Sequence, residues 1–340
     1  MTQRLILHIG HPKTGTTTLQ KTLQASRPAL LDAGILYPDA GHNHNVLLPY
    51  LTSEASIMQQ LESSPSEVVK KSSDKWDGVL EEVSTFNPNT IILSSESFFR
   101  DLGVDALSNL SSRLKSLASE VVIAAYLREP ASLALSRVQQ NIKLKPNFTL
   151  PPKDYYRARL APYKTSGLGS MNVRVFDRKA LKEGDIVEDF LGQHLPDLDP
   201  KKLSRHKDAN TSSSAEAMAL IQEVQRKERS FPWRKVSFAI ANADCELDGF
   251  ARPRMHEHIR HAIQTRCTDL DWLKDEIDLE FSNIDTGAMP CSEANQLCDA
   301  LDRIEDICVV DTDRKAALWS AVCKNHTPIR RLLRRVWNKS

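Results

Sequence analysis

The strongest indication of the fold lies near the start of the chain, in the sequence Leu5-Ile6-Leu7-His8-Ile9-Gly10-His11-Pro12-Lys13-Thr14-Gly15-Thr16-Thr17-Thr18-Leu19-Gln20. Its first residues form an apolar run of the kind found in a buried strand. A tight loop with two glycines and a lysine follows, and three consecutive threonines then open an amphipathic helix. In a strand, loop and helix of this order, backbone N–H groups and the positive helix end face a bound anion, and a lysine adds a point charge. The stretch therefore predicts a phosphate-binding loop after the first strand.

The loop is close to the nucleotide-triphosphate loop, Gly-x4-Gly-Lys-[Ser/Thr], but its lysine is displaced. Lys13 stands two residues before the second glycine, and Thr16 occupies the place of the usual lysine. This arrangement resembles the 5′-phosphosulfate loop of sulfotransferases that use 3′-phosphoadenosine-5′-phosphosulfate (PAPS). The resemblance assigns nucleotide binding to a continuous run of residues: Pro12, Lys13, Thr14, Gly15, Thr16, Thr17 and Thr18.

A second motif follows the apolar run at 121–127, which ends in Arg128 and leads into a helix with Pro130 in its first turn. The same family reads the nucleotide 3′-phosphate with an arginine at a strand end and a serine eight residues later. Arg128 and Ser136 match that spacing. An arginine suits the role because its planar fork binds phosphate oxygens in pairs and stays charged. The resemblance therefore implies that these two residues hold the 3′-phosphate.

Weaker landmarks resemble bacterial members of the family, namely Gly34-Ile35-Leu36-Tyr37-Pro38 and Asp271-Trp272-Leu273. The chain also departs from the family. The Arg-Lys-Gly loop with which cytosolic sulfotransferases contact the 3′-phosphate is missing after the last expected strand. The basic run Ser204-Arg205-His206-Lys207 is a candidate replacement, and a solvated loop is the alternative.

The expected strands alternate with helices along the first two thirds of the chain. Strands are expected near 4–10, 34–38, 90–94, 121–127 and 172–176, and helices near 16–30, 76–86, 104–119 and 184–194, with a solvated segment at 63–75. This order predicts an α/β fold, a P-loop-like parallel β-sheet flanked by helices. We expect residues 1–208 to form the PAPS-binding core. Residues 209–340 are expected to be a mainly helical extension or lid packed on it.

The strand ends bring three candidate residues to one edge of the expected sheet. Ligands of parallel sheets bind at the carboxyl ends of the strands, where Lys13, Glu96 and Arg128 all fall. The resemblance implies that Lys13 stabilises the leaving group. Glu96 is expected to be the catalytic base, since a glutamate serves heparan-type members, and burial beside Phe98 and Phe99 raises a carboxyl pKa. His44 is the rival base, because a histidine titrates near neutral pH without tuning.

Composition argues for a globular enzyme without a nucleic-acid partner. The formal net charge of the 340 residues is +1, with 41% hydrophobic and 26% charged residues. The six cysteines all follow residue 240 and form no Cys-x-x-Cys pair, so we expect no metal and read them as reduced thiols, with a disulfide between Cys291 and Cys298 as the alternative. The first residues show no charged-then-apolar leader pattern, and a cytoplasmic location is expected.

The expected function is transfer of a sulfuryl group from PAPS to a hydroxyl, which leaves adenosine 3′,5′-bisphosphate (PAP). The bacterial resemblance implies a carbohydrate or other small alcohol as acceptor, and a glycan or glycolipid hydroxyl is the prior expectation. A P-loop kinase or NTPase and a non-catalytic nucleotide-binding module remain the alternatives. Two further features suggest contacts with other molecules: a basic helix at 328–340 that would lie on anionic membrane, and basic residues that would face an anionic acceptor, Lys143, Lys145, Arg157, Arg159 and Lys164.

Overall fold

A computed structural model describes residues 2–54, 64–206, 212–227 and 233–325 of the chain. The chain divides into two compact units that interleave in sequence. The first unit contains Met1–Glu129, Asp154–Asp208 and Asp269–Phe281, and the second contains Pro130–Lys153, Ala209–Thr268 and Ser282–Ser340. One of the points at which the chain passes from the first unit to the second is at residue 208, the expected boundary. The assignment of 1–208 and 209–340 to a nucleotide-binding core and a lid stays a prediction.

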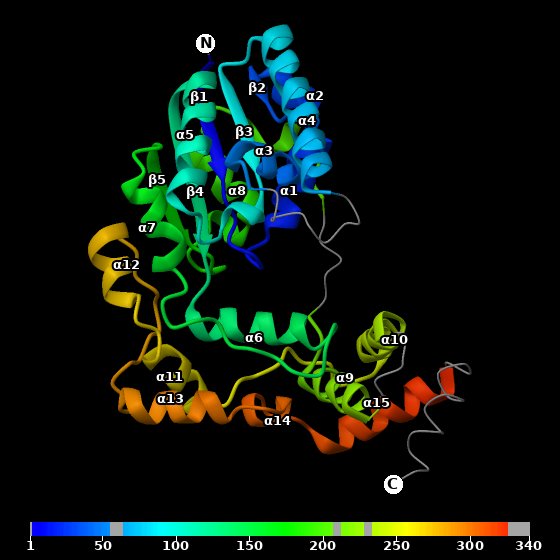
Figure 1. The fold of residues 1–340 in the computed structure, drawn as a ribbon. Coiled ribbons are helices and arrows are strands. Elements are labelled where there is room, and N and C mark those ends of the chain that lie inside the picture. The colour runs from blue at the N-terminus through cyan, green and yellow to red at the C-terminus, as the bar shows by residue number, and fades with distance from the viewer. Residues whose placement is uncertain (1, 55–63, 207–211, 228–232, 326–340) are drawn as a thin grey trace. The chain divides into compact units, whose positions relative to one another are not determined.

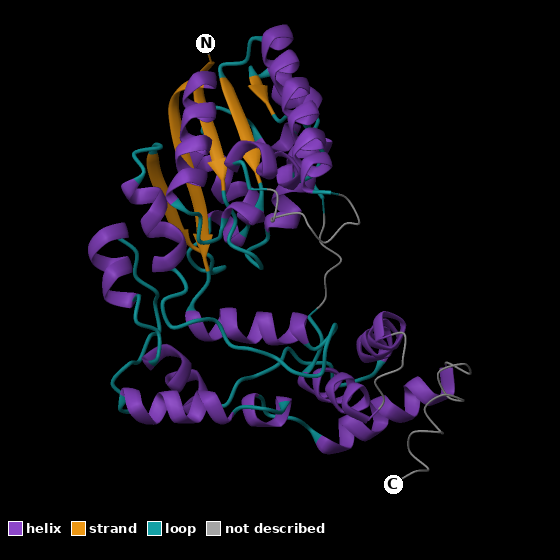
Figure 2. Cartoon of the chain, in the orientation of Figure 1, coloured by secondary structure: helices purple, strands orange, loops and turns teal. Residues whose placement is uncertain are grey.

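The first unit is built around a parallel sheet, which confirms the predicted α/β class (Figures 1 and 2). Among the described residues the sheet has five strands in the order β2-β3-β1-β4-β5, and every neighbouring pair is parallel. The strands are β1 (Thr2–His8), β2 (Ile35–Leu36), β3 (Thr90–Ser94), β4 (Ala118–Leu127) and β5 (Ser170–Val175). The direction of the strand order reverses at β1, with β3 and β2 on one side of it and β4 and β5 on the other. Such a reversal is where parallel sheets bind ligands.

Strand β1 is central because its side chains are apolar on both faces. Leu5, Ile6 and Leu7 have no exposed surface. Helices α1, α2 and α8 pack on one face of the sheet in a continuous apolar core, and α5 packs against β1 and β4. The main helices of the unit are α1 (Thr16–Ala25), α2 (Arg27–Asp32), α3 (Leu48–Thr52), α4 (Pro65–Phe86), α5 (Val104–Leu117), α7 (Arg157–Thr165), α8 (Ile186–His194) and α12 (Leu270–Ile277).

Two helix predictions in this unit were wrong. The helix expected at 16–30 breaks at Ser26, where α1 ends and α2 starts with Pro28 in its first turn. The segment 63–75, expected to be solvated and outside the helix at 76–86, belongs mostly to α4, which begins at Pro65, eleven residues before the expected start. Ser64 and Glu67 form a capping box in which the Ser64 N–H donates to the Glu67 carboxylate at 2.8 Å. The capping box and Pro65 after it begin the helix at a point that the polar composition of the segment did not indicate.

The second unit is helical, as expected for the C-terminal region, and contributes no strand to the sheet in the described residues (Figure 2). Its helices are α6 (Pro130–Asn141), α9 (Ala215–Lys227), α10 (Trp233–Glu246), α11 (Glu257–Thr265), α13 (Cys291–Ala300), α14 (Ile304–Ile307) and α15 (Thr312–Asn325). Cys298 is buried and Cys291 exposed, and no disulfide joins them in the described part of the chain. The basic helix expected at 328–340 lies outside the described residues.

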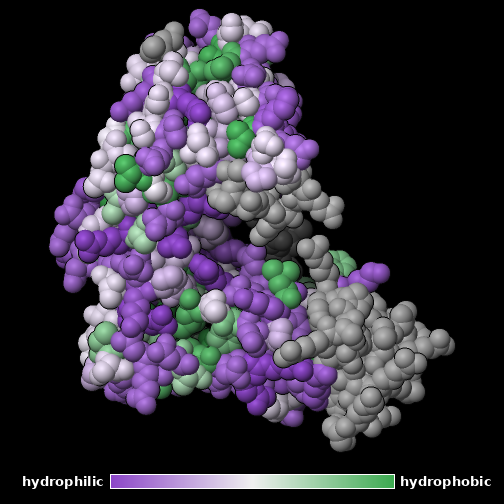
Figure 3. Space-filling model, in the orientation of Figure 1, coloured by the Kyte–Doolittle hydropathy of each residue, from purple (hydrophilic) through white to green (hydrophobic). Residues whose placement is uncertain are grey.

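The surface of the first unit is coloured by residue hydropathy in Figure 3. The face of the first unit seen in Figure 3 is mainly hydrophilic, interrupted by small hydrophobic patches. Among the described residues of this unit, the most exposed large hydrophobic residue is Val104 at the start of α5, with 85% of its surface accessible. In the residues that the structure describes, none of the helices combines the length and the apolar character that a membrane crossing requires.

Candidate functional site

The loop between β1 and α1 turns through three left-handed residues. Gly10, Lys13 and Gly15 have φ angles of 93°, 73° and 74°. Lysine carries a Cβ that makes this region unfavourable, so the surrounding contacts must hold it there. The Thr14 hydroxyl donates to the His11 carbonyl at 2.6 Å, and the Tyr126 N–H of β4 donates to the Gly10 carbonyl at 3.1 Å. Loops of this shape surround anions with backbone N–H groups.

Helix α1 begins in the way that an anion site requires. Gly15 is its N-cap, and within the described residues no side chain caps it and no acidic residue occupies its first turn, where Thr16, Thr17 and Thr18 stand. The first N–H groups of a helix need acceptors, and the helix dipole favours a negative charge beside them. A Cβ on Gly15 would lie 3.1 Å from Ile186 Cγ2 and 3.3 Å from the Phe176 ring. Glycine is therefore required by space as well as by φ.

Glu96 lies directly beside this loop. It opens a short 3-10 turn, Glu96–Phe98, after β3, and the Thr16 hydroxyl donates to its Oε1 atom. A Cβ on Gly10 would lie 3.1 Å from the Glu96 Cα. Burial raises the pKa of the Glu96 carboxyl, and the positive charge of the exposed Lys13 opposes that rise. The structure thus brings Lys13, Thr16 and Glu96 together. Lys13 and Glu96 are two of the three residues, with Arg128, that the strand ends placed at one edge of the sheet.

Arg128, at the end of β4, shares a wall with the loop. Its guanidinium carbon lies 5.2 Å from the centre of the Phe176 ring, and the same ring packs against Gly15. The Tyr156 hydroxyl donates to the Arg128 carbonyl at 2.6 Å and fixes the backbone there. Ser136 is almost fully buried in α6, which belongs to the second unit. The predicted pairing of Arg128 and Ser136 stays a prediction.

His44, the rival base, is fully buried and has both ring nitrogens engaged. Nδ1 accepts a hydrogen bond from the Ser94 N–H at 3.0 Å, and Nε2 donates to the Pro38 carbonyl at 3.2 Å. Burial lowers the pKa of His44 to about 4. A neutral imidazole that links β3 to the Pro38 turn has no free lone pair for a proton, so the geometry gives His44 a structural role.

Two of the basic residues that the sequence singled out form ion pairs in this unit. Arg205, in the basic run that was a candidate for the 3′-phosphate, lies 2.7 Å from Asp185 and 3.5 Å from Glu188. Lys164 pairs with Glu276 at 2.7 Å, and Arg159 stacks on the Tyr155 ring at 3.9 Å. Lys207 lies outside the described residues.

Two groups near the site were not predicted. Phe176, the wall shared by Gly15 and Arg128, follows β5 directly, and an aromatic residue at a strand's carboxyl end is the only signal it gives. His11 is buried in the loop and packs edge-on against Phe99 at 4.9 Å and Tyr155 at 5.5 Å. Both contacts join residues that are far apart in sequence, so no local pattern reveals them.

Comparisons with known proteins give no assignment. No family model matches the chain, and no curated protein matches it. Among the described residues, no group of three or more His, Cys, Asp or Glu side chains is placed to hold a metal ion.

Proposed function

We propose that this protein is a PAPS-dependent sulfotransferase, with its donor site at the carboxyl edge of the sheet. The observation that carries the proposal is the cluster of Lys13, Thr16 and Glu96, with a cation, a helix N-terminus and a carboxyl on adjoining loops. The chemistry needs these three elements. A nucleotide phosphosulfate requires anion contacts, and an attacking alcohol requires a base.

In the proposed reaction an acceptor oxygen forms a bond to sulfur while the bond from sulfur to the 5′-phosphate oxygen breaks. The hydroxyl proton passes to Glu96, and PAP leaves with the electron pair of the broken bond. Negative charge grows on the leaving oxygen, where Lys13 and the first N–H groups of α1 would stabilise it. The raised pKa of Glu96 suits a base that must take a proton and give it up again near neutral pH.

Arg128 would hold the 3′-phosphate, with Ser136 as its expected partner. Its guanidinium rests on Phe176, so that the fork is oriented by the ring before nucleotide arrives. Because Phe176 also packs on Gly15, one ring supports both phosphate contacts. This geometry favours a nucleotide with phosphates at both the 5′ and 3′ positions over a simple triphosphate.

The direct test is sulfuryl transfer from radiolabelled PAPS to a panel of carbohydrate and aliphatic alcohols. Lys13→Ala is expected to lower turnover by more than it weakens PAP binding, since Lys13 meets charge that grows in the transition state. Lys75→Ala, which removes an exposed lysine of α4, is the matched control and should act as wild type. A Lys13 variant with normal turnover and weaker PAP binding would limit Lys13 to binding.

A further inference from the structure

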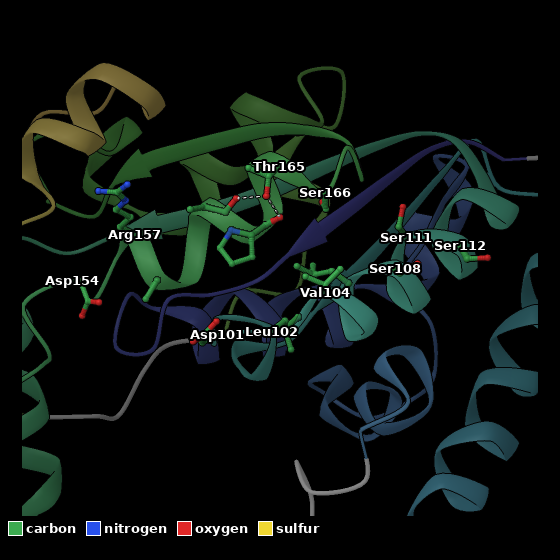
Figure 4. A pocket seen from close by; sticks show the side chains of 15 residues that line it. Asp101, Leu102, Val104, Ser108, Ser111, Ser112, Asp154, Arg157, Thr165 and Ser166 are labelled. Carbon is green, nitrogen blue, oxygen red and sulfur yellow. Dashed lines mark hydrogen bonds between the residues drawn. The ribbon is translucent and has the colours of Figure 1, made fainter.

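A groove runs between α5 and α7 in the first unit, apart from the phosphate loop. It has a volume of about 940 Å³, within the range of sites for small organic ligands. Its α5 wall presents Val104, Leu107, Ser108, Ser111 and Ser112, which share one helix face, and its α7 wall presents Ala158, Ala161, Pro162 and Thr165 (Figure 4).

The direction of the two helices places one end of the groove beside the proposed site. Helix α5 leaves the carboxyl end of β3 and leads to the amino end of β4, and α7 leads to the amino end of β5. Both therefore start at the carboxyl edge of the sheet. The groove residues at this end are Asp101, Asp154 and Arg157, which Figure 4 shows away from Ser111 and Ser112 at the other end.

Residues that precede each wall in the sequence pack against the phosphate loop. The α5 wall continues backward in sequence to Phe99, and the α7 wall to Tyr155. These two rings pack on His11, next to Pro12 and Lys13, at 4.9 and 5.5 Å between ring centres. The Tyr163 hydroxyl, on α7, donates to the Phe98 carbonyl at 2.7 Å, which ties the same helix to the Glu96 turn.

The lining indicates what such a groove accepts. Beyond Arg157, the side chains that line the groove along the two helices are aliphatic or hydroxylic and uncharged. Charge is confined to the end at the carboxyl edge, where two carboxylates and one guanidinium leave a net charge of −1. This end disfavours an anionic ligand, and the uncharged walls favour a ligand with an aliphatic part.

We infer that the groove between α5 and α7 holds the acceptor, and that the acceptor is a neutral amphipathic alcohol. Its hydroxyl end points past Asp101 and Asp154 toward the carboxyl edge of the sheet, where Glu96 stands, and its aliphatic part lies along Leu107, Ala161 and Pro162. The inference rests on the proposed sulfotransferase function. It differs from the anionic acceptor that the basic residues suggested; of these, Lys164 is paired with Glu276 and Arg157 lies at the charged end of the groove.

The test uses n-octyl β-D-glucoside below its micelle concentration, methyl β-D-glucoside as its counterpart without the chain, and PAP. The octyl compound should bind the full-length protein at least about 100-fold more tightly than the methyl compound in calorimetry, because the chain buries apolar surface. Ser108→Trp and Ala161→Phe block the groove from opposite walls. Each should weaken octyl glucoside binding at least about tenfold, and both should leave PAP binding unchanged.

Ser116→Trp is the matched control, since Ser116 is an exposed serine of α5 that does not line the groove. Equal affinity for the octyl and methyl compounds, or blocking variants that bind the octyl compound like wild type, would overturn the groove inference while PAP binding stands. A wild-type protein that does not bind PAP would overturn the sulfotransferase proposal and the acceptor role that depends on it.

Discussion

In the proposed reaction Glu96 is the catalytic base, and His44 is a structural residue. Glu96→Gln should lower turnover about 100- to 10,000-fold, the usual cost of losing a general base. The folded state raises the Glu96 pKa, so its stabilising contribution is present at low pH and is lost as pH rises through the folded pKa. At neutral pH the glutamine variant should therefore unfold at the same urea concentration as wild type, or a higher one. The kcat/KM of wild type should fall as pH drops through this pKa.

His44→Ala should behave in the opposite way. It leaves the Ser94 N–H and the Pro38 carbonyl without their partner in a buried place, which costs about 1–3 kcal/mol for each unsatisfied group. We expect a clear loss of stability and near-normal turnover per folded molecule, measured by urea unfolding and by activity on the same samples. A stable His44→Ala protein without activity, beside an active Glu96→Gln protein, would transfer the role of base to His44.

Helix α8 is fastened to the sheet by Asp189, whose side chain is almost fully buried. Its carboxylate accepts two hydrogen bonds from Arg174, at 2.7 and 2.9 Å, and one from the Tyr126 hydroxyl at 2.9 Å. Burial alone would raise the Asp189 pKa, but these bonds outweigh burial and lower it. Asp189→Asn should lower the free energy of unfolding by about 2 kcal/mol or more in urea titration. The exposed Asp197→Asn is the control, and equal stability of the two variants would contradict this role.

The helices and strands differ in how well the sequence predicts them. The strands of the sheet were predictable because apolar runs such as 121–127 are buried on both faces and end in turn residues. The start of α4 was missed because Ser64 and Glu67 form their capping box inside a polar segment that resembles a loop. Lys13 and Glu96 were predictable as neighbours because both follow parallel strands. The place of Phe176 in the site was not predictable, because its contact with Gly15 depends on how β1 and β5 are placed in the folded sheet.

The first unit as a whole should be sensitive to acid, because burial lowers the pKa of three of its buried histidines. Burial lowers the pKa of His8 to about 3 and those of His44 and His194 to about 4. The unfolded chain takes up protons below pH 6.5 that the folded chain refuses, so stability falls as pH falls below 6.5. By pH 5 each histidine costs about 2 kcal/mol.

Urea unfolding at pH 7.5 and pH 5 measures this loss. His194→Leu should reduce the loss of stability between pH 7.5 and pH 5. The substitution breaks no hydrogen bond of the ring, since neither ring nitrogen of His194 has a hydrogen-bond partner among the described residues. The exposed His42→Leu should leave the difference unchanged. An unfolding midpoint that is the same at both pH values in wild type would contradict the neutral buried state of these histidines.

Calorimetry with PAP, AMP and ATP tests which nucleotide the carboxyl edge of the sheet binds. PAP should bind wild type about 10- to 100-fold more tightly than AMP, the value of about 1.5–3 kcal/mol expected for a charge-assisted phosphate contact. Arg128→Ala should remove that preference, and Arg128→Lys should restore only part of it, since lysine keeps the charge but lacks the fork. Equal affinity for PAP and AMP in wild type, or tight binding of ATP that requires magnesium, would contradict the PAPS site and favour a P-loop kinase or NTPase.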